Sequence, residues 1–92
     1  MERLTDDARE ALSTAVPDWE VAGEVLRRTF EFRSFVEAMG FATSVALVAE
    51  KANHHPDIDI RWNRVTLALT THDADGLTDR DVELAVRIDK LI

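Results

Sequence analysis

All three histidines of the chain lie in one short stretch. His54 and His55 are adjacent and stand directly before Pro56, and His72 follows further along the chain. Histidine titrates near neutrality, so a group of three offers both a proton donor and a proton acceptor at physiological pH. A reaction that removes water needs such a pair, one group to protonate the departing hydroxyl and one to take a proton from nitrogen. The three histidines are therefore the candidate catalytic residues.

Carboxylates flank these histidines on both sides. Glu50 precedes His54 by one helical turn, and Asp73 and Asp81 follow the last histidine. A nearby carboxylate fixes the tautomer of an imidazole, and such a cluster can separate one acidic from one basic histidine. Asp81 also has a purely structural interpretation, because it stands three residues after Thr78 and would close the cap of a helix that begins there.

A metal site is the main alternative for histidines beside carboxylates, since zinc and iron both accept these ligands. However, the adjacent side chains of His54 and His55 point in different directions on an extended chain. They also lack the i,i+4 spacing of helical zinc motifs. The pattern therefore favours acid-base chemistry without a metal. Trp19 and Trp62, the two tryptophans, are either core residues or platforms for a flat ligand.

A predicted hairpin brings the histidines together. Two runs of alternating apolar residues follow the histidine pair, Ile58, Ile60 and Trp62 in the first and Val65, Leu67 and Leu69 in the second. The alternation changes parity between the runs. A two-residue turn at Asn63-Arg64 explains this change, because asparagine tolerates positive φ. Pairing about that turn places His54, His55 and His72 at one end of a sheet.

The remaining elements complete an α+β domain. We expect a helix over about 5–15 that Pro17 ends, then strands over 19–21 and 25–32 with a turn at Gly23. Ser34, with Glu37 as capping-box partner, begins a long helix that ends near residue 53. Its expected apolar stripe is Phe35, Met39, Ala42, Val45 or Ala46, Ala49 and Ala52.

A last helix follows Thr78, lined by Val82, Ala85, Ile88 and Ile92. The element order is therefore α-β-β-α-β-β-α. It predicts a four-stranded antiparallel sheet with three helices packed on one face. With 92 residues, we expect a single domain over 1–92.

Composition restricts the classes of partner. The net charge is −7, from 18 acidic against 11 basic side chains, so the chain repels phosphate backbones and anionic membranes. There is no cysteine, which excludes disulfides and thiolate chemistry. No apolar run reaches the roughly 18 residues that a membrane span needs, and the first residues are charged. We expect a cytoplasmic protein that binds a small molecule or another protein, and no nucleic acid or membrane.

Several motifs in register resemble the pterin-4a-carbinolamine dehydratase family. The signature is the run Glu50-Lys51-Ala52-Asn53-His54-His55-Pro56, followed by the aromatic Trp62. The likeness continues in Thr71-His72-Asp73, in Gly76-Leu77-Thr78-Asp79-Arg80-Asp81, and upstream in Trp19 and Arg28-Thr29-Phe30-Glu31-Phe32. It covers most of the chain, from about residue 19 to residue 91.

The resemblance implies a dehydratase that converts 4a-hydroxytetrahydrobiopterin, a pterin-4a-carbinolamine, to quinonoid dihydropterin and water. It implies no cofactor and no metal, and assembly as a homodimer or homotetramer. Position by position, it implies His54, His55, His72, Asp81 and Glu50 as catalytic residues.

The resemblance also implies a set of residues that bind the substrate. Beside the three histidines, these are Pro56, Thr71, Asp73, Ala74, Trp19 and Trp62. The family also contains dimerisation cofactors of a homeodomain transcription factor and relatives that act as protein-assembly factors. A non-catalytic interaction protein on the same fold is therefore the alternative function.

Overall fold

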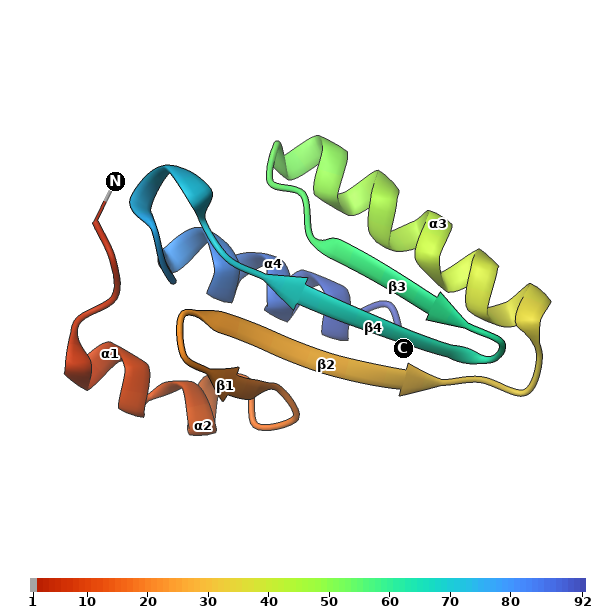
Figure 1. Cartoon of the computed structure of the whole chain (residues 1–92), viewed down its shortest axis with the longest axis horizontal. Coiled ribbons are helices and arrows are strands. Elements are labelled where there is room, and N and C mark those ends of the chain that lie inside the picture. Colours follow the sequence, from red (N-terminus) through yellow and green to blue (C-terminus); the bar gives the residue numbers. More distant parts are fainter. Residues whose placement is uncertain (1) are drawn as a thin grey trace.

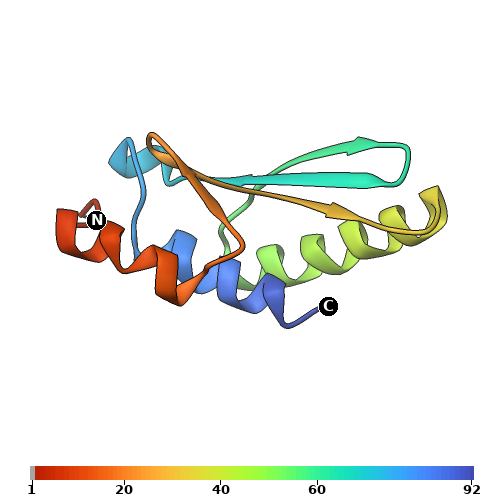
Figure 2. The same cartoon turned by 90° about the horizontal axis from the view of Figure 1, so that it is seen from below.

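The fold is a four-stranded antiparallel sheet with the helices on one of its faces, as predicted (Figures 1 and 2). The computed structural model describes residues 2–92. The elements are α1 (Asp6–Glu10), α2 (Leu12–Ala15), β1 (Glu20–Ala22), β2 (Val25–Glu31), α3 (Phe35–Ala52), β3 (Asp57–Arg61), β4 (Arg64–Leu69), the 3-10 turn η1 (His72–Ala74) and α4 (Asp79–Asp89). Spatially the strands follow the order β1-β2-β4-β3.

The two central strands supply the sheet side of the core. In β2 and β4 alternate residues point toward the helices, and Leu26 pairs with Leu69 while Phe30 pairs with Val65. All four of these side chains are almost fully buried. The opposite face of the sheet stays open and polar, and Thr29 and Thr66 share a hydrogen bond there between their hydroxyl groups. The alternation of apolar and polar residues thus determines which face the helices cover.

The β3–β4 hairpin forms as predicted, but its turn lies one residue earlier. Arg61 pairs with Arg64, so the turn consists of Trp62 and Asn63, and Trp62 adopts a φ of +52°. Asn63 is buried and donates from Nδ2 to the carbonyl of Phe32, while the Phe32 amide donates to the Asn63 carbonyl. Because these two bonds hold Asn63 against the end of β2, the left-handed position falls on Trp62.

The N-terminal helix differs slightly from the prediction. Ala11 separates α1 from α2, so the expected single helix over 5–15 is two short ones. Thr5 caps the first of them, because its Oγ1 accepts a hydrogen bond from the Ala8 amide. The first strand begins at Glu20, so that Trp19 precedes it.

The long helix α3 is rotated relative to the predicted stripe. Its buried residues are Ala38, Phe41, Ala42, Val45 and Ala49. Phe35 and Met39, which we expected in the stripe, are 52% and 41% exposed, so this part of the prediction was wrong. The reason is an aromatic cluster. The centroid of the Phe41 ring lies 4.6 Å from the ring centroid of Phe30 and 5.0 Å from that of Phe32. That contact turns Phe41 inward and the neighbouring face outward.

Both long helices begin with capping side chains. Ser34 Oγ accepts from the Glu37 amide, as predicted, but Glu37 Oε1 accepts from the Arg33 amide rather than from Ser34. At α4 the capping box of Thr78 and Asp81 is complete. Leu84, Ala85 and Ile88 face the core of the protein from α4, whereas Ile92 is exposed. Among residues 2–92, no helix combines the length and apolar character that crossing a bilayer requires.

Candidate active site

A pocket of about 200 Å³ lies at the end of the sheet where β3 begins and β4 ends. Its lining contains all three histidines, together with Asn53, Thr70, Thr71, Asp73 and Arg80. The histidines therefore meet as the hairpin spacing predicted. The pocket is formed by the segment after α3, the segment after β4, and the first turn of α4.

The end of α3 orients His54. Asn53 adopts a left-handed conformation with φ +52°, and the His54 amide donates back to the carbonyl of Ala49. This bonding is the Schellman arrangement that commonly ends a helix. Pro56, two residues on, prevents the helix from continuing. The backbone therefore turns sharply at Asn53 and directs His54 beneath the sheet, toward α4.

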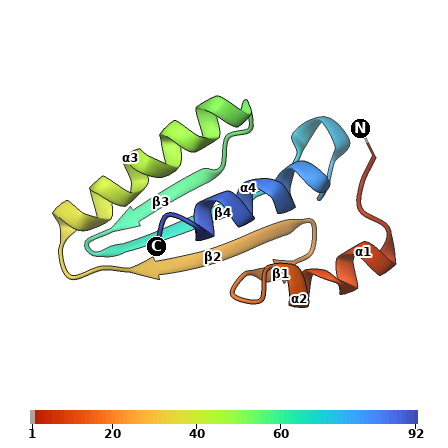
Figure 3. The ribbon, with the colours of Figure 1, turned by 180° about the vertical axis from the view of Figure 1, so that it is seen from behind.

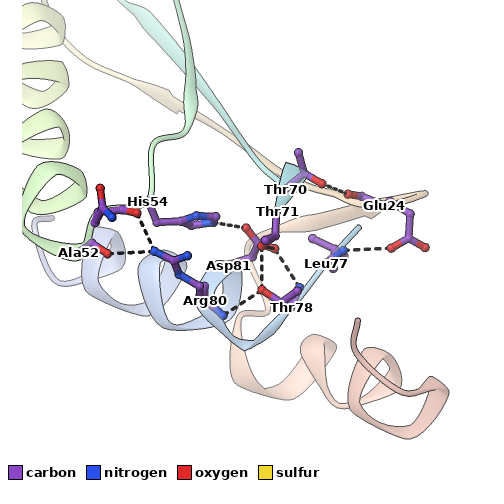
Figure 4. A network of polar contacts seen from close by, with 10 residues as sticks. Glu24, Ala52, His54, Thr70, Thr71, Leu77, Thr78, Arg80 and Asp81 are labelled. Carbon is purple, nitrogen blue, oxygen red and sulfur yellow. Dashed lines mark hydrogen bonds and ion pairs between the residues drawn. The ribbon is translucent and has the colours of Figure 1, made fainter. Parts of the chain in front are cut away.

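His54 is held by a buried carboxylate. Its Nε2 lies 2.5 Å from Oδ1 of Asp81, which comes from the first turn of α4 and has no solvent exposure (Figure 4). Because an ionised carboxylate only accepts hydrogen bonds, Nε2 carries the proton in the neutral ring. Nδ1 is then the ring nitrogen with a free lone pair. Asp81 thus selects the tautomer of His54, and it also caps α4.

Two threonines complete the buried network around Asp81. Oδ2 accepts from Thr71 Oγ1 at 2.9 Å and from the Thr78 amide at 2.9 Å. Each hydroxyl has one proton, so Thr71 uses its own on Asp81, and Thr78 donates to Thr71 over 2.7 Å. No buried side-chain nitrogen or oxygen among the described residues lacks a partner. The carboxylate is therefore fully satisfied and fixed in position.

Arg80 is a site residue that the sequence reasoning missed. Its Nη2 donates to the carbonyl of Asn53 at 2.6 Å and to that of Ala52 at 3.4 Å (Figure 4). It therefore ties the first turn of α4 to the segment that carries His54, and it also lines the pocket. One signal was available, because a cation in the first turn of a helix opposes the helix dipole. Such a placement indicates that the side chain has another partner.

A closed loop presents His72. The Thr71 amide donates to the Gly76 carbonyl and the Gly76 amide donates to the Thr71 carbonyl, so the loop is pinned at its base. Asp75 reverses the chain with a φ of +56°. A Cβ on Gly76 would collide with the Glu24 carboxylate, which would then have to give up the hydrogen bond that it accepts from the Leu77 amide. His72 and Asp73 are exposed at the mouth of the pocket.

His55 forms the outer rim of the site together with Glu50. Its Nε2 lies 2.8 Å from Glu50 Oε1, and both side chains are well exposed. Glu50 thus contacts one of the histidines, although it does not line the pocket. An exposed pair of this kind remains free to rearrange around a ligand.

The other predicted site residues lie outside the pocket lining. Trp62 is at the opposite end of the β3–β4 hairpin, where it is 72% exposed. Trp19 is buried in the core, and its Nε1 donates to Asp89 near the end of α4. Pro56 and Ala74 are half-buried beside the pocket without lining it. Within the single chain, neither tryptophan is brought to the histidines.

The site holds three imidazoles in different environments. One imidazole is nearly buried and fixed by a carboxylate, and two are exposed at the rim. Within residues 2–92, no three histidine or carboxylate side chains converge closely enough to hold a metal ion. Ionisable side chains line the pocket from more than one side.

Comparisons with known proteins identify a family that matches nearly the whole chain. The family model described as pterin 4 alpha carbinolamine dehydratase matches residues 2–91. A protein of Thermomicrobium roseum, provisionally named a pterin-4-alpha-carbinolamine dehydratase, is 50% identical over 91 residues, which is 99% of this chain and 98% of that protein. A protein of Acidobacterium capsulatum with the same provisional name is 51% identical over the full length of both chains.

Solved structures show the same fold. The crystal structure of a transcriptional coactivator/pterin dehydratase from Brucella melitensis has a TM-score of 0.90 and 36% identity, covering 97% of each chain. A pterin dehydratase-like protein described as a RuBisCO assembly factor in the alpha-carboxysome has a TM-score of 0.70 and 24% identity. That match covers 84% of this chain and 92% of that one, and it supports the fold alone. With a family match over nearly its whole length and relatives at about half identity, this chain belongs to the pterin-4-alpha-carbinolamine dehydratase family.

Proposed function

We propose that this chain catalyses the dehydration of 4a-hydroxytetrahydrobiopterin to quinonoid dihydropterin and water. The observation that carries the proposal is the buried pair of His54 and Asp81 beside a pocket that His55 and His72 also line. Such a pair provides a histidine of defined tautomer at the wall of a small polar pocket. Family membership supports the choice of a pterin carbinolamine as the substrate.

The reaction requires one proton to be delivered and one to be removed. The bond between C4a and the hydroxyl oxygen breaks, and a proton delivered to that oxygen lets it leave as water. The proton on the neighbouring ring nitrogen passes to a base, and its electron pair forms the new double bond to C4a. Histidine suits both tasks near neutral pH, and general acid-base help of this kind contributes about 10²–10⁴-fold.

The geometry supports a division of roles among the histidines. His54 acts through Nδ1, because Asp81 occupies its Nε2. His72, on the loop after β4, lines the pocket from the opposite element, and its imidazole makes no hydrogen bond among the described residues that would restrict it. We assign these two to opposite faces of the flat pterin ring. His55 binds and orients the ring, with Glu50 as its partner.

The test is stopped-flow dehydration of freshly generated 4a-hydroxytetrahydrobiopterin. We expect acceleration by the wild-type chain and its loss in His54→Ala/His72→Ala. Arg61→Gln is the control, since Arg61 lies at the far end of the hairpin. Equal rates for wild type, the double histidine variant and a blank, with folding verified by circular dichroism, would reject the enzyme and favour a non-catalytic interaction protein.

We also propose that a second copy of the chain covers the outer face of α3. Val36 and Leu47 are 78% and 69% exposed, and Met39 is partly exposed on the same face, which is unusual for apolar side chains on one helix. Helices that pack along such a stripe form the bundles typical of homo-oligomers. Sedimentation equilibrium should give an oligomer for the wild type and for Ile92→Glu, and a smaller species for Leu47→Glu.

An oligomer that persists in Leu47→Glu would reject this interface. A wild-type monomer would also reject it. The exposed face would then be free to bind a different protein, which the alternative function as a non-catalytic interaction protein requires.

A further inference from the structure

A groove between α3 and α4 adjoins the candidate active site. Beside Arg80 and His54 there is a hollow of about 160 Å³, whose lining also contains Lys51, Glu83 and Arg87. A second hollow of about 320 Å³ is lined by Val48, Lys51, Arg87 and Lys90. Lys51 and Arg87 belong to both linings, so the two hollows are neighbours, and together they are called the groove. The two helices lie side by side on the covered face of the sheet (Figure 3).

Basic side chains without carboxylate partners gather in this groove. Of the eleven basic residues in the chain, five form ion pairs with Asp or Glu, namely Arg9, Arg28, Arg33, Arg61 and Arg64. Among residues 2–92, the six that form none are Arg3, Arg27, Lys51, Arg80, Arg87 and Lys90. Four of these six line the groove. Glu83 is the only acid in its lining, and it too forms no ion pair within the described part of the chain.

This local concentration of positive charge is opposite in sign to the net charge of the protein. The chain carries a net charge of −7, so carboxylates are abundant and cations could easily pair with them. On the open face of the sheet two of the three cations do, since Arg61 pairs with Asp59 and Arg64 with Glu31, whereas Arg27 forms no ion pair among residues 2–92. In the groove, by contrast, Lys51, Arg87 and Lys90 from two helices have no carboxylate partner among residues 2–92, so an anion bound there would reduce the repulsion among them. The groove therefore has the electrostatic character of an anion site.

We propose that the groove between α3 and α4 binds a small molecule through an oxyanion, a phosphate group being the best fit. Lys51 provides a point charge and Arg87 a planar guanidinium, the two side-chain types that hold phosphate in proteins. The hollows are of small-molecule size. The negative charge of the remaining surface repels long polyanions such as nucleic acids.

The position of the groove gives its anion two sources. Because His54 and Arg80 line both the groove and the histidine pocket, a bound anion lies next to the pterin. It is either a charged side chain on a pterin substrate other than tetrahydrobiopterin, whose own side chain is neutral, or a separate oxyanion bound beside the substrate. Both sources present an oxyanion to the same basic side chains, and kinetic measurements distinguish between them.

The binding test uses inorganic phosphate and the full chain labelled with ¹⁵N. Phosphate replaces chloride at constant ionic strength, because screening alone would alter the spectra. We expect saturable amide shifts in segments 48–54 and 80–90, with affinity at least about tenfold weaker in Lys51→Gln/Arg87→Gln. Both side chains are exposed and make no hydrogen bond or ion pair within residues 2–92, so this variant keeps the fold.

The matched control is Arg3→Gln/Arg27→Gln. It changes the net charge by the same amount and also removes two exposed cations without ion pairs, but outside the groove. Wild-type affinity in this control supports a local site. Equal weakening in both double variants, or no saturable shift in the wild type, overturns the proposal.

The second arm identifies the source and rests on the proposed dehydratase function. Dehydration is compared for two 4a-hydroxytetrahydropterins, one with a neutral and one with a phosphorylated side chain. A lower KM for the phosphorylated substrate that disappears in Lys51→Gln/Arg87→Gln supports the substrate's own side chain as the source. Equal KM values with phosphate binding intact support a separate anion. No acceleration of either substrate rejects the dehydratase and leaves the phosphate titration as an independent measurement.

Discussion

Nε2 of His54 and Oδ1 of Asp81 lie 2.5 Å apart, although 27 positions separate the two residues in the chain. One comes from the segment that ends α3 and the other from the first turn of α4. The pair therefore joins the packing of two helices to the orientation of a candidate catalytic imidazole. Substitutions in the segment that carries His54 or in the first turn of α4 should alter both stability and turnover.

Replacement of Asp81 by Asn should lower turnover strongly and stability moderately. The side-chain amide keeps the shape of the carboxylate, but it cannot accept hydrogen bonds from His54, Thr71 and the Thr78 amide at once. We expect a loss of about 1–3 kcal/mol in the free energy of unfolding, since a buried donor is left without an acceptor. Urea unfolding and stopped-flow dehydration measure the two effects.

Asp89→Asn is the control for Asp81→Asn. Asp89 also accepts hydrogen bonds, from Trp19 and Arg28, but it lies outside the pocket. It should lose stability with turnover retained. Full turnover in Asp81→Asn would refute the assigned role of the carboxylate.

Arg80 is predicted to be a positioning residue for His54. Arg80→Gln removes the bonds to the carbonyls of Asn53 and Ala52, so the segment that carries His54 loosens. We expect kcat to fall on the order of tenfold, because small displacements of catalytic groups are costly. KM should change less. Arg80→Lys, which keeps a cation near the same carbonyls, should recover part of kcat.

A merely structural role for Arg80 would give a different pattern. Thermal unfolding would then shift while kcat stayed at the wild-type value, and Arg80→Lys would bring no kinetic recovery. That combination of results would remove Arg80 from the site.

The left-handed residue Asn53 should control both the end of α3 and the activity. Alanine at this position has no favourable left-handed conformation, so Asn53→Ala should destabilise the chain by about 1–2 kcal/mol. Glycine adopts positive φ freely, so Asn53→Gly should match or exceed wild-type stability. Because His54 follows directly, turnover should fall in the alanine variant and persist in the glycine variant. Equal stability of the two variants would show that the φ of +52° is unimportant.

Trp62→Gly should leave turnover of the chain unchanged. Trp62 is exposed in the hairpin turn, has a positive φ, and lies at the opposite end of the hairpin from the histidines. Glycine removes the strain of a left-handed tryptophan, so the unfolding free energy should rise by a few tenths to about 1 kcal/mol. A marked loss of turnover in the folded variant would instead support the substrate-binding role implied by the family resemblance.

The local parts of the site could be predicted from the sequence by itself. Alternating apolar residues on both sides of the turn predict a hairpin, and Pro56 ends the helix before it, so the meeting of His54, His55 and His72 follows from their distances to the turn. The cap of α4 likewise needs only the three-residue spacing of Thr78 and Asp81. These features depend on neighbours along the chain, which periodicity and capping rules describe well.

Only the tertiary structure decided which partners meet across elements. The contact of Phe41 with Phe30 and Phe32 set the rotation of α3, which no helical period specifies by itself. The bonds of Asn63 to Phe32 moved the hairpin turn by one residue. Asp81 and Arg80 reach the His54 segment because α4 packs beside the end of α3, and the same packing forms the basic groove. Side-chain packing between distant segments fixes these relationships, so the spacing of residues within one segment cannot predict them.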